Sequence, residues 1–326
     1  MTDHKKFVTT ASGVIQHDHN HDGIDRRGFL KCMAWAGTGA VFVAEAGVLK
    51  STALGAEVGS SRKHGNRLSF VQISDSHMGF NKPANPDVVG TLKAAVDKIN
   101  ALPDSPDFIL HTGDITHLST PEQFDTVDQI LKSTNKEVFF VPGEHDVLND
   151  DGAMFRGRYF KNSKGSGWYS FDKNGAHFVG LVNVMNLKAG GLGNLGHEQL
   201  EWLEDDLRGV KHSTPVVIFA HIPLWTVYPQ WGWGTDDGAQ ALSYLKKFGS
   251  VTVLNGHIHQ TMQKVEGNVT FHTACSTAFP QPAPGQGEGP GPMKVPAEQL
   301  RKVLGITDVN YLQRHHALAL LDSSLA

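Results

Sequence analysis

The sequence predicts a mixed α/β protein built from two sheets that are flanked by helices. Strand and helix signals alternate from Leu68 onward, a pattern that is typical of βα units. Five short polar groups stand where apolar, strand-like runs end. Loops at the carboxyl ends of such strands converge on one edge of a sheet, where active groups gather. We therefore expect one site built from loops of both sheets.

The first elements follow in order along the chain. Residues 68–73 form an apolar run typical of a buried strand. Residues 88–99 carry apolar side chains at helical spacing, and Pro103 lies just beyond them. Residues 108–110 are the next apolar run, which leads directly into a Gly-Asp pair. This order predicts strand, helix and strand.

The next helix carries a clear start signal. Thr120 is the expected N-cap, Pro121 the first helical residue, and Gln123 the partner in a capping box. The helix is expected to run to about Lys132. A third strand is predicted at 138–141.

The second half starts with a hairpin signal. Residues 168–184 alternate around Asn174 and Gly175, which is a strong turn pair. An amphipathic helix is expected at 199–207. The remaining predicted strands are 216–220, 251–254, 263–265, 269–273 and 316–321.

Residues 1–56 are expected to be an export leader. Arg26 and Arg27 form a twin-arginine pattern before a modest apolar run at 33–48. A membrane anchor after a chance arginine pair is the alternative, but the run is short for a spanning helix and Glu45 interrupts it. We therefore expect passage through the Tat translocase, a periplasmic or secreted location, and no stable membrane anchor.

The remaining residues, 57–326, are expected to form a single domain with a motif core at 68–275 and a C-terminal extension at 276–326. The net charge of −4 gives no global basic field for nucleic acid. Of the two cysteines, Cys32 lies in the leader, so Cys275 has no partner for an internal disulfide in the mature chain.

The polar groups carry metal-ligating residue types. They are Asp75-Ser76-His77, Gly113-Asp114, Gly143-Glu144-His145-Asp146, His221 and Gly256-His257-Ile258-His259. Each alone can be an ordinary turn or a hydrogen-bonded histidine at a strand end. Together they supply enough carboxylates and imidazoles for two metal ions. Mixed nitrogen and oxygen ligands suit iron, manganese or zinc in divalent or trivalent form.

The whole series resembles the motifs of the calcineurin-like metallophosphoesterase superfamily: D-x-H, G-D-x-x, G-N-H-D/E, a single His, and G-H-x-H. The resemblance covers roughly residues 68–275 and implies a four-layer α/β/β/α sandwich. It also implies a two-metal site in which a bridging hydroxide attacks a small-molecule phosphomonoester or phosphodiester. The opening motif is most similar to small bacterial phosphodiesterases, which include cyclic-nucleotide enzymes.

The resemblance assigns a role to each position. The implied ligands of the first ion are Asp75, His77 and His259. The implied ligands of the second ion are His221, His257 and whatever stands at position 144, with Asp114 bridging both ions. His145 is implied to contact the phosphate and protonate the leaving group, with Asp146 orienting it. His117 stands where purple acid phosphatases have tyrosine, and it is either a supporting residue or a helix-entry residue.

Glu144 departs from the pattern, which usually has a neutral Asn there. If Glu144 binds metal, it adds a negative charge that tightens cation binding and favours an ion such as ferric iron. If it points away, the second site is weak. The alternative function is a periplasmic metal-binding or sensing protein with a degenerate, inactive site, although the intact other ligand positions argue against decay.

Three further features each have two interpretations. An aromatic loop after His221 can wall the substrate pocket or pack onto its domain; its members are Trp225, Tyr228, Trp231 and Trp233. Arg156, Arg158 and Lys161 can meet a second phosphate or be surface charges. His272 can approach the metals or be a buried, hydrogen-bonded histidine.

Overall fold

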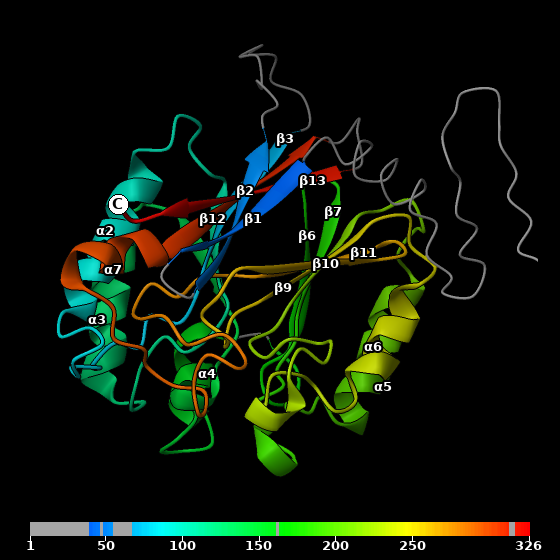
Figure 1. The fold of residues 1–326 in the computed structure, drawn as a ribbon. Coiled ribbons are helices and arrows are strands. Elements are labelled where there is room, and N and C mark those ends of the chain that lie inside the picture. Colours follow the sequence, from blue (N-terminus) through cyan, green and yellow to red (C-terminus); the bar gives the residue numbers. More distant parts are fainter. Residues whose placement is uncertain (1–38, 46–47, 55–66, 161–162, 313–316) are drawn as a thin grey trace, which may run out of the picture.

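Two mixed sheets with helices on their outer faces form a four-layer arrangement (Figure 1). The structure is a computed structural model that describes residues 39–45, 48–54, 67–160, 163–312 and 317–326. The helices are α2 (Val88–Asn100), α3 (Pro121–Lys132), α4 (Ala153–Tyr159), α5 (His197–Arg208), α6 (Gly238–Leu245) and α7 (Ala297–Val303). The predicted fold class is confirmed.

The five-stranded sheet has the order β13-β12-β3-β4-β5. Its strands are β3 (Arg67–Ile73), β4 (Phe108–His111), β5 (Glu137–Phe140), β12 (Gly305–Leu312) and β13 (Ala317–Ser324). β3, β4 and β5 are parallel, so their carboxyl ends lie at one edge.

The six-stranded sheet has the order β10-β11-β9-β8-β7-β6. Its strands are β6 (Tyr169–Lys173), β7 (Ala176–Gly180), β8 (Val216–Phe219), β9 (Val251–Asn255), β10 (Met262–Glu266) and β11 (Val269–Thr273). β7, β8, β9 and β11 are parallel to one another. β6 and β7 are the antiparallel pair predicted around Asn174 and Gly175.

Three apolar layers hold the sandwich together. On β3, Val71 and Ile73 pack against α2 and α3, whereas Leu68 and Phe70 face the other sheet. This alternation follows from the period of two in a strand. The layer between the sheets is rich in aromatic rings; Phe70 and Phe108, for example, stack with centroids 4.9 Å apart. A third layer lies between the six-stranded sheet and helices α5 and α6.

The predicted elements are present with small shifts at their ends. The start of α3 is as expected, because the Thr120 side chain accepts a hydrogen bond from the Gln123 backbone N–H. The sequence analysis did not predict α4, α6, α7 or β12. Of the last strand predicted at 316–321, residue 316 lies outside the described residues, and β13 begins at residue 317.

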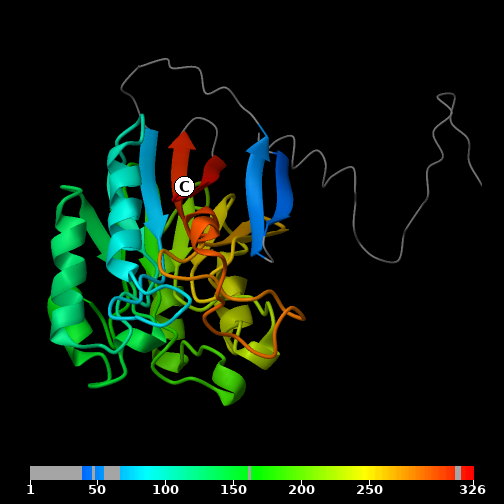
Figure 2. The ribbon, with the colours of Figure 1, turned by 60° about the vertical axis from the view of Figure 1, so that its left-hand side comes forward.

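Two strands are described within the predicted leader. β1 (Gly39–Glu45) and β2 (Val48–Leu54) pair in an antiparallel sheet of their own, and β2 lies close to β13 and β10 (Figure 2). The twin-arginine pair Arg26-Arg27 and Cys32 lie outside the described residues. Within the described part of the chain, no helix has the length and hydrophobicity needed to span a membrane.

Candidate metal centre

The five polar groups converge where the carboxyl ends of both sheets meet. The Asp75 N–H donates to the Gly113 carbonyl at 3.0 Å, and the His77 N–H donates to the Asp114 carbonyl at 2.8 Å. Across the sheets, the His257 N–H lies 3.1 Å from one Asp75 carboxylate oxygen. The loops are therefore fixed to one another by hydrogen bonds from backbone N–H groups to carbonyl and carboxylate oxygens, and the side chains at their tips are held together.

Many of these tips have a left-handed backbone. Non-glycine residues with positive φ are uncommon, and the conformation costs about 1–2 kcal/mol each. Five predicted ligands adopt it: Asp75, His77, Asp114, His257 and His259, with φ of 53°, 39°, 49°, 69° and 54°. Strain of this kind persists when the surroundings determine the conformation, and it concentrates at functional sites.

Two motif glycines make the close approach possible. A Cβ on Gly113, whose φ is 98°, would lie only 2.5 Å from Nδ1 of His221. A Cβ on Gly143 would overlap the carboxylate of Asp114. Both positions therefore require glycine for Asp114 and His221 to reach the centre.

The first cluster joins Asp75, His77 and His259. The Asp75 Oδ1 lies 3.2 Å from Nε2 of His259, and the two histidine Nε2 atoms lie 3.2 Å apart. Burial opposes the charge of Asp75, but the neighbouring His259 and His221 hold its pKa below the usual value. Burial, together with the other histidines around it, holds the pKa of His77 well below the usual range. His77 is therefore a neutral imidazole, the form that binds metal.

The second cluster joins Glu144, His221 and His257. The two carboxylate oxygens of Glu144 lie 3.0 Å from Nε2 of His221 and 3.0 Å from Nδ1 of His257. Burial works against the charge of Glu144, but His257 and His221 hold its pKa well below the usual range. Burial lowers the pKa of His221, but Asp114 and Glu144 raise it well above its usual value. Glu144 thus points into the centre.

Asp114 lies between the two clusters. Its Oδ2 is 3.5 Å from Nε2 of His77 and 3.5 Å from Nε2 of His221. Its Oδ1 accepts a hydrogen bond of 2.9 Å from the His145 backbone N–H. One buried carboxylate oxygen therefore faces a histidine of each cluster, which is the position predicted for a bridging ligand.

Polar atoms without hydrogen-bond partners show that the residues suit metal ions. The His221 Nδ1 is 2.7 Å from the Thr112 carbonyl, and the His259 Nδ1 is 2.6 Å from the Phe279 carbonyl. A carbonyl oxygen only accepts, so in the neutral rings each Nδ1 carries the proton and each Nε2 offers a lone pair. Although the His221 Nε2 and Glu144 Oε2 are 3.0 Å apart, neither has a hydrogen bond of acceptable geometry. The donor set fits cations.

The predicted contact between Asp146 and His145 is wrong. The Asp146 carboxylate accepts four hydrogen bonds of 2.8–3.0 Å from Gly143, Ile115 and Thr116. It therefore holds two motif loops together, and its oxygens are occupied. Burial and the neighbouring Asp114 raise the pKa of Asp146 to about 7, against the effect of these donors.

The His117 carbonyl takes the role predicted for Asp146. The His145 Nδ1 lies 2.8 Å from this carbonyl oxygen, so the ring is oriented by backbone. The two imidazoles also stack, with centroids 4.8 Å apart and planes at 19°. Burial lowers the pKa of His145, but the carboxylates of Asp114 and Glu144 raise it above its usual value. His117 is thus a supporting residue of the site.

The supporting groups that the sequence analysis missed are mainly carbonyls and aromatic rings. The Phe279 ring stacks on His77 at 4.7 Å and contacts His259 at 4.7 Å. The Gln281 side chain donates to the His257 carbonyl at 3.1 Å. Phe279 lies outside the five motifs, so no motif points to it, and no residue type marks a carbonyl.

The structure gives packing, ion-pair or hydrogen-bond contacts to members of all three open features, and Lys161 lies outside the described residues. Trp233 is fully buried, and Trp225 packs on Phe271 with centroids 4.8 Å apart. Arg158 forms ion pairs with Asp125 and Asp128 on the surface. The remaining feature, His272, is buried and lies 3.0 Å from the Asp322 carboxylate.

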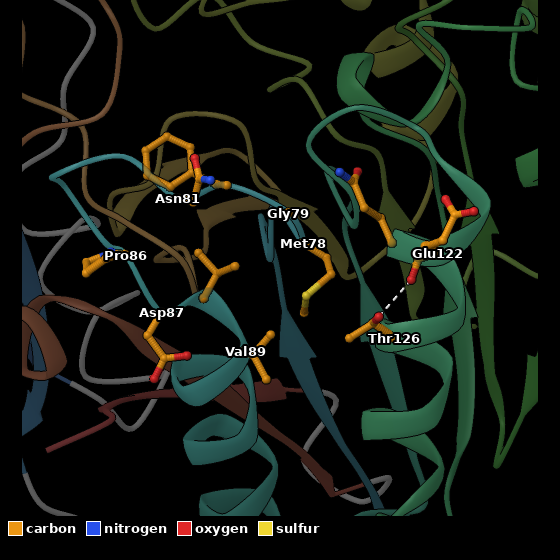
Figure 3. A pocket seen from close by; sticks show the side chains of 11 residues that line it. Met78, Gly79, Asn81, Pro86, Asp87, Val89, Glu122 and Thr126 are labelled. Carbon is orange, nitrogen blue, oxygen red and sulfur yellow. Dashed lines mark hydrogen bonds between the residues drawn. The ribbon is translucent and has the colours of Figure 1, made fainter.

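A cavity of about 290 Å³ lies between the first turns of α2 and α3 (Figure 3). Met78 and Val89 contribute apolar side chains, and Thr126 lines it from α3. None of the predicted metal ligands lines this cavity. The Phe80 ring, which also lines it, contacts the His117 ring with centroids 5.2 Å apart, so the cavity borders the metal centre without containing it.

Comparisons with known proteins agree with this geometry. A family model described as calcineurin-like phosphoesterase matches residues 68–261. The chain is 24% identical over 218 residues to a 3',5'-cyclic-nucleotide phosphodiesterase of Nostoc sp., which covers 65% of this chain and 79% of that protein. It is 28% identical over 176 residues to a serine/threonine-protein phosphatase of Mus musculus, which covers 48% of this chain and 56% of that protein.

A solved structure has a similar fold. The dimetal phosphatase from Danio rerio aligns with a TM-score of 0.60 and 16% sequence identity, over 79% of this chain and 96% of that one. At this identity the similarity shows the fold, and it supports the four-layer sandwich.

Proposed function

Because this chain belongs to the calcineurin-like phosphoesterase family and is thereby a hydrolase of phosphoric ester bonds, we propose that it hydrolyses small-molecule phosphomonoesters or phosphodiesters with two metal ions. The observation that carries the proposal is the pair of carboxylate–imidazole clusters joined by Asp114. Each cluster offers one carboxylate and two imidazoles of its own.

In the proposed site the chain's residues divide their roles by position. The ligands of the first ion are Asp75, His77 and His259, and those of the second are Glu144, His221 and His257, with Asp114 shared. When bound, such a pair of ions activates water as a nucleophile and withdraws charge from the phosphoryl oxygens. The candidate ions are iron, manganese and zinc.

His145 is the proposed proton donor to the leaving group. Its Nδ1 is held by the His117 carbonyl, so its Nε2 is the nitrogen left to face a substrate. The backbone N–H of the same residue is held by the Asp114 carboxylate. Asp146 acts through the backbone of the Gly113 and Gly143 loops, which places it among the positioning residues.

The test is an assay with metal analysis on the purified chain. Bis-p-nitrophenyl phosphate and p-nitrophenyl phosphate are offered with iron, manganese or zinc, and Asp114→Asn is the control. We expect two metal equivalents and turnover well above that variant. Two bound ions with turnover no higher than Asp114→Asn would sink the enzyme proposal and leave the alternative, a metal-binding or sensing protein.

We also propose that the protein is exported by the Tat translocase to the periplasm or beyond. The Arg26-Arg27 pattern supports this. Export argues for scavenged or lipid-linked phosphoesters, because cyclic nucleotides are mainly cytosolic. Replacing both arginines by lysine is expected to retain the full-length chain in the cytoplasm. An unchanged distribution in cell fractionation would contradict Tat export.

A further inference from the structure

We infer that the alcohol released from the substrate has an apolar chain next to the phosphoester oxygen, and that Leu118 and Leu148 form the surface that receives this chain. This inference rests on the proposed function, in which His145 protonates the leaving-group oxygen. It adds a substrate class, namely phosphoesters of alkyl or similarly apolar alcohols.

Three exposed apolar side chains stand on loops that follow strands leading to the site. In the described part of the chain, five large hydrophobic side chains are exposed: Leu118, Leu148, Leu187, Val265 and Leu321. The first three stand on loops that leave the carboxyl ends of β4, β5 and β7, and are 51%, 56% and 43% exposed. Single exposed leucines are normal, so their grouping is the informative part.

Leu118 and Leu148 belong to loops that are fixed to each other. The Asn149 side chain donates to the Leu118 carbonyl at 2.7 Å and to the Ser119 carbonyl at 3.2 Å. The Ser119 hydroxyl in turn donates to the Asp146 carbonyl at 2.8 Å. The two loops that carry the exposed leucines are therefore joined to each other and form one rim beside the site.

This rim adjoins the proposed proton donor. Leu118 directly follows His117, whose carbonyl and ring both hold the His145 imidazole. Leu148 stands three residues after His145 in the loop that carries it. In the inferred arrangement, the alcohol that receives a proton from His145 extends along this rim and contacts the two leucines. Contact with an apolar chain covers their exposed surface, which is favourable.

A chain-length series tests the inference. Propyl, pentyl and heptyl phosphates have leaving alcohols of equal acidity, so their rates differ through contact with the alkyl chain. Methyl diesters of the same alcohols replace them if the p-nitrophenyl assay shows diesterase activity alone. We expect kcat/KM to rise about twofold per methylene, because full burial of a methylene is worth about fourfold and a half-covered chain gains about half of that free energy.

Leu118→Ser and Leu148→Ser are each expected to flatten this dependence, and the double variant to abolish it. Both side chains are exposed, so these variants should keep the metal content and fold of the parent. Val265→Ser on β10 is the matched control, with 54% exposure, and should keep the full dependence.

Measurable hydrolysis without chain-length dependence, or a dependence that persists in the double variant, overturns the subsite and leaves the proposed function intact. Hydrolysis of no phosphoester at all, in either the alkyl series or the p-nitrophenyl assay, overturns both.

Discussion

The two clusters of candidate metal ligands have the same composition but are built differently. Each offers one carboxylate and two imidazoles and shares Asp114. In the first cluster, the side chains of Asp75, His77 and His259 are at most 3% exposed, and all three residues have positive φ. In the second, Glu144 is 25% exposed, and only His257 has positive φ.

The first cluster is the more preorganised of the two, and the second is the more accessible to solvent. The first cluster is set by strained backbone and covered by the Phe279 ring. The second depends more on the long Glu144 side chain and borders solvent. Glu144 also equalises the formal charge of the two clusters, which the usual Asn would not do. Any difference between the two ions should therefore come from access more than from ligand type.

The largest effect that tests this comparison is metal removal. A chelator is expected to abolish activity completely, with metal leaving in two steps. Because the second cluster is the more exposed, its ion should leave first and take the activity with it. Metal content followed against time and residual turnover measures this. Simultaneous loss of both ions would contradict the difference in access, and recovery on adding manganese or zinc is the control for unfolding.

Paired alanine variants of one motif give the next largest effect. His259→Ala removes a fully enclosed ligand of the first cluster, and we expect a loss in kcat/KM of about 10³-fold, roughly 4 kcal/mol. His257→Ala removes a ligand at the open side, where water can replace it, and should cost about 10- to 100-fold. Steady-state kinetics with metal analysis decides. Equal losses would show that exposure does not distinguish the clusters.

Glu144→Asn is expected to have a smaller effect with two opposite parts. Removing one negative charge should weaken binding of the second ion by about tenfold, or about 1.4 kcal/mol. At saturating metal, the same change should raise kcat/KM, because a less charged centre repels an anionic phosphoester less. Metal titration and kinetics on the variant measure both parts.

Glu144→Gln is the matched control because it keeps the length of the side chain and removes only the charge. It should reproduce the weaker metal binding. Unchanged metal affinity in both variants would show that Glu144 does not bind the second ion.

The residues that the structure brings together could be predicted from the sequence because candidate ligands are side chains of recognisable types at strand ends. Asp75, His77, Asp114 and His221 follow apolar runs, and parallel strands bring such positions together. The direction of Glu144 was left open, since one methylene permits either orientation. Its placement between His221 and His257 depends on loops that meet only in the folded chain.

The partner of His145 could not be predicted for a related reason. The family resemblance implied Asp146, but the short 3₁₀ helix Glu144–Asp146 (η1) leaves that carboxylate accepting from the Ile115, Thr116 and Gly143 N–H groups. The carbonyl that replaces it has no sequence signature.

The strand β12 was missed because Thr307, Asp308 and Asn310 interrupt its apolar pattern. Tertiary pairing with β3 and β13 decides its structure.

His177 lies near the start of β7, at the end of the six-stranded sheet away from the candidate metal centre. It can be compared with the histidines of the two clusters, because two carboxylates satisfy it without an ion. His177 lies 2.9 Å from Asp172 and 2.8 Å from Asp206. Burial lowers its pKa, but hydrogen bonds to Asp206 and Asp172 raise it above the usual value. Because the folded state binds the His177 proton more tightly than the unfolded chain does, protonation stabilises the fold. The effect is complete below about pH 6.5, the pKa in the unfolded chain, and is lost as pH rises through the folded-state pKa.

His177→Gln should therefore lower the free energy of unfolding by about 1 kcal/mol near pH 6, a modest value because water screens the exposed Asp172. The difference from the parent should shrink toward pH 9, because the histidine loses its proton as the pH rises through its folded-state pKa. Urea unfolding of the metal-loaded protein at both pH values measures it. His197→Gln is the control, because His197 is 84% exposed in its ion pair with Glu201 and should contribute little. A loss of unfolding free energy at pH 9 as large as at pH 6 would mean that packing, and not charge, holds His177. Its carboxylate partners would then not explain how it differs from the candidate metal-ligating histidines.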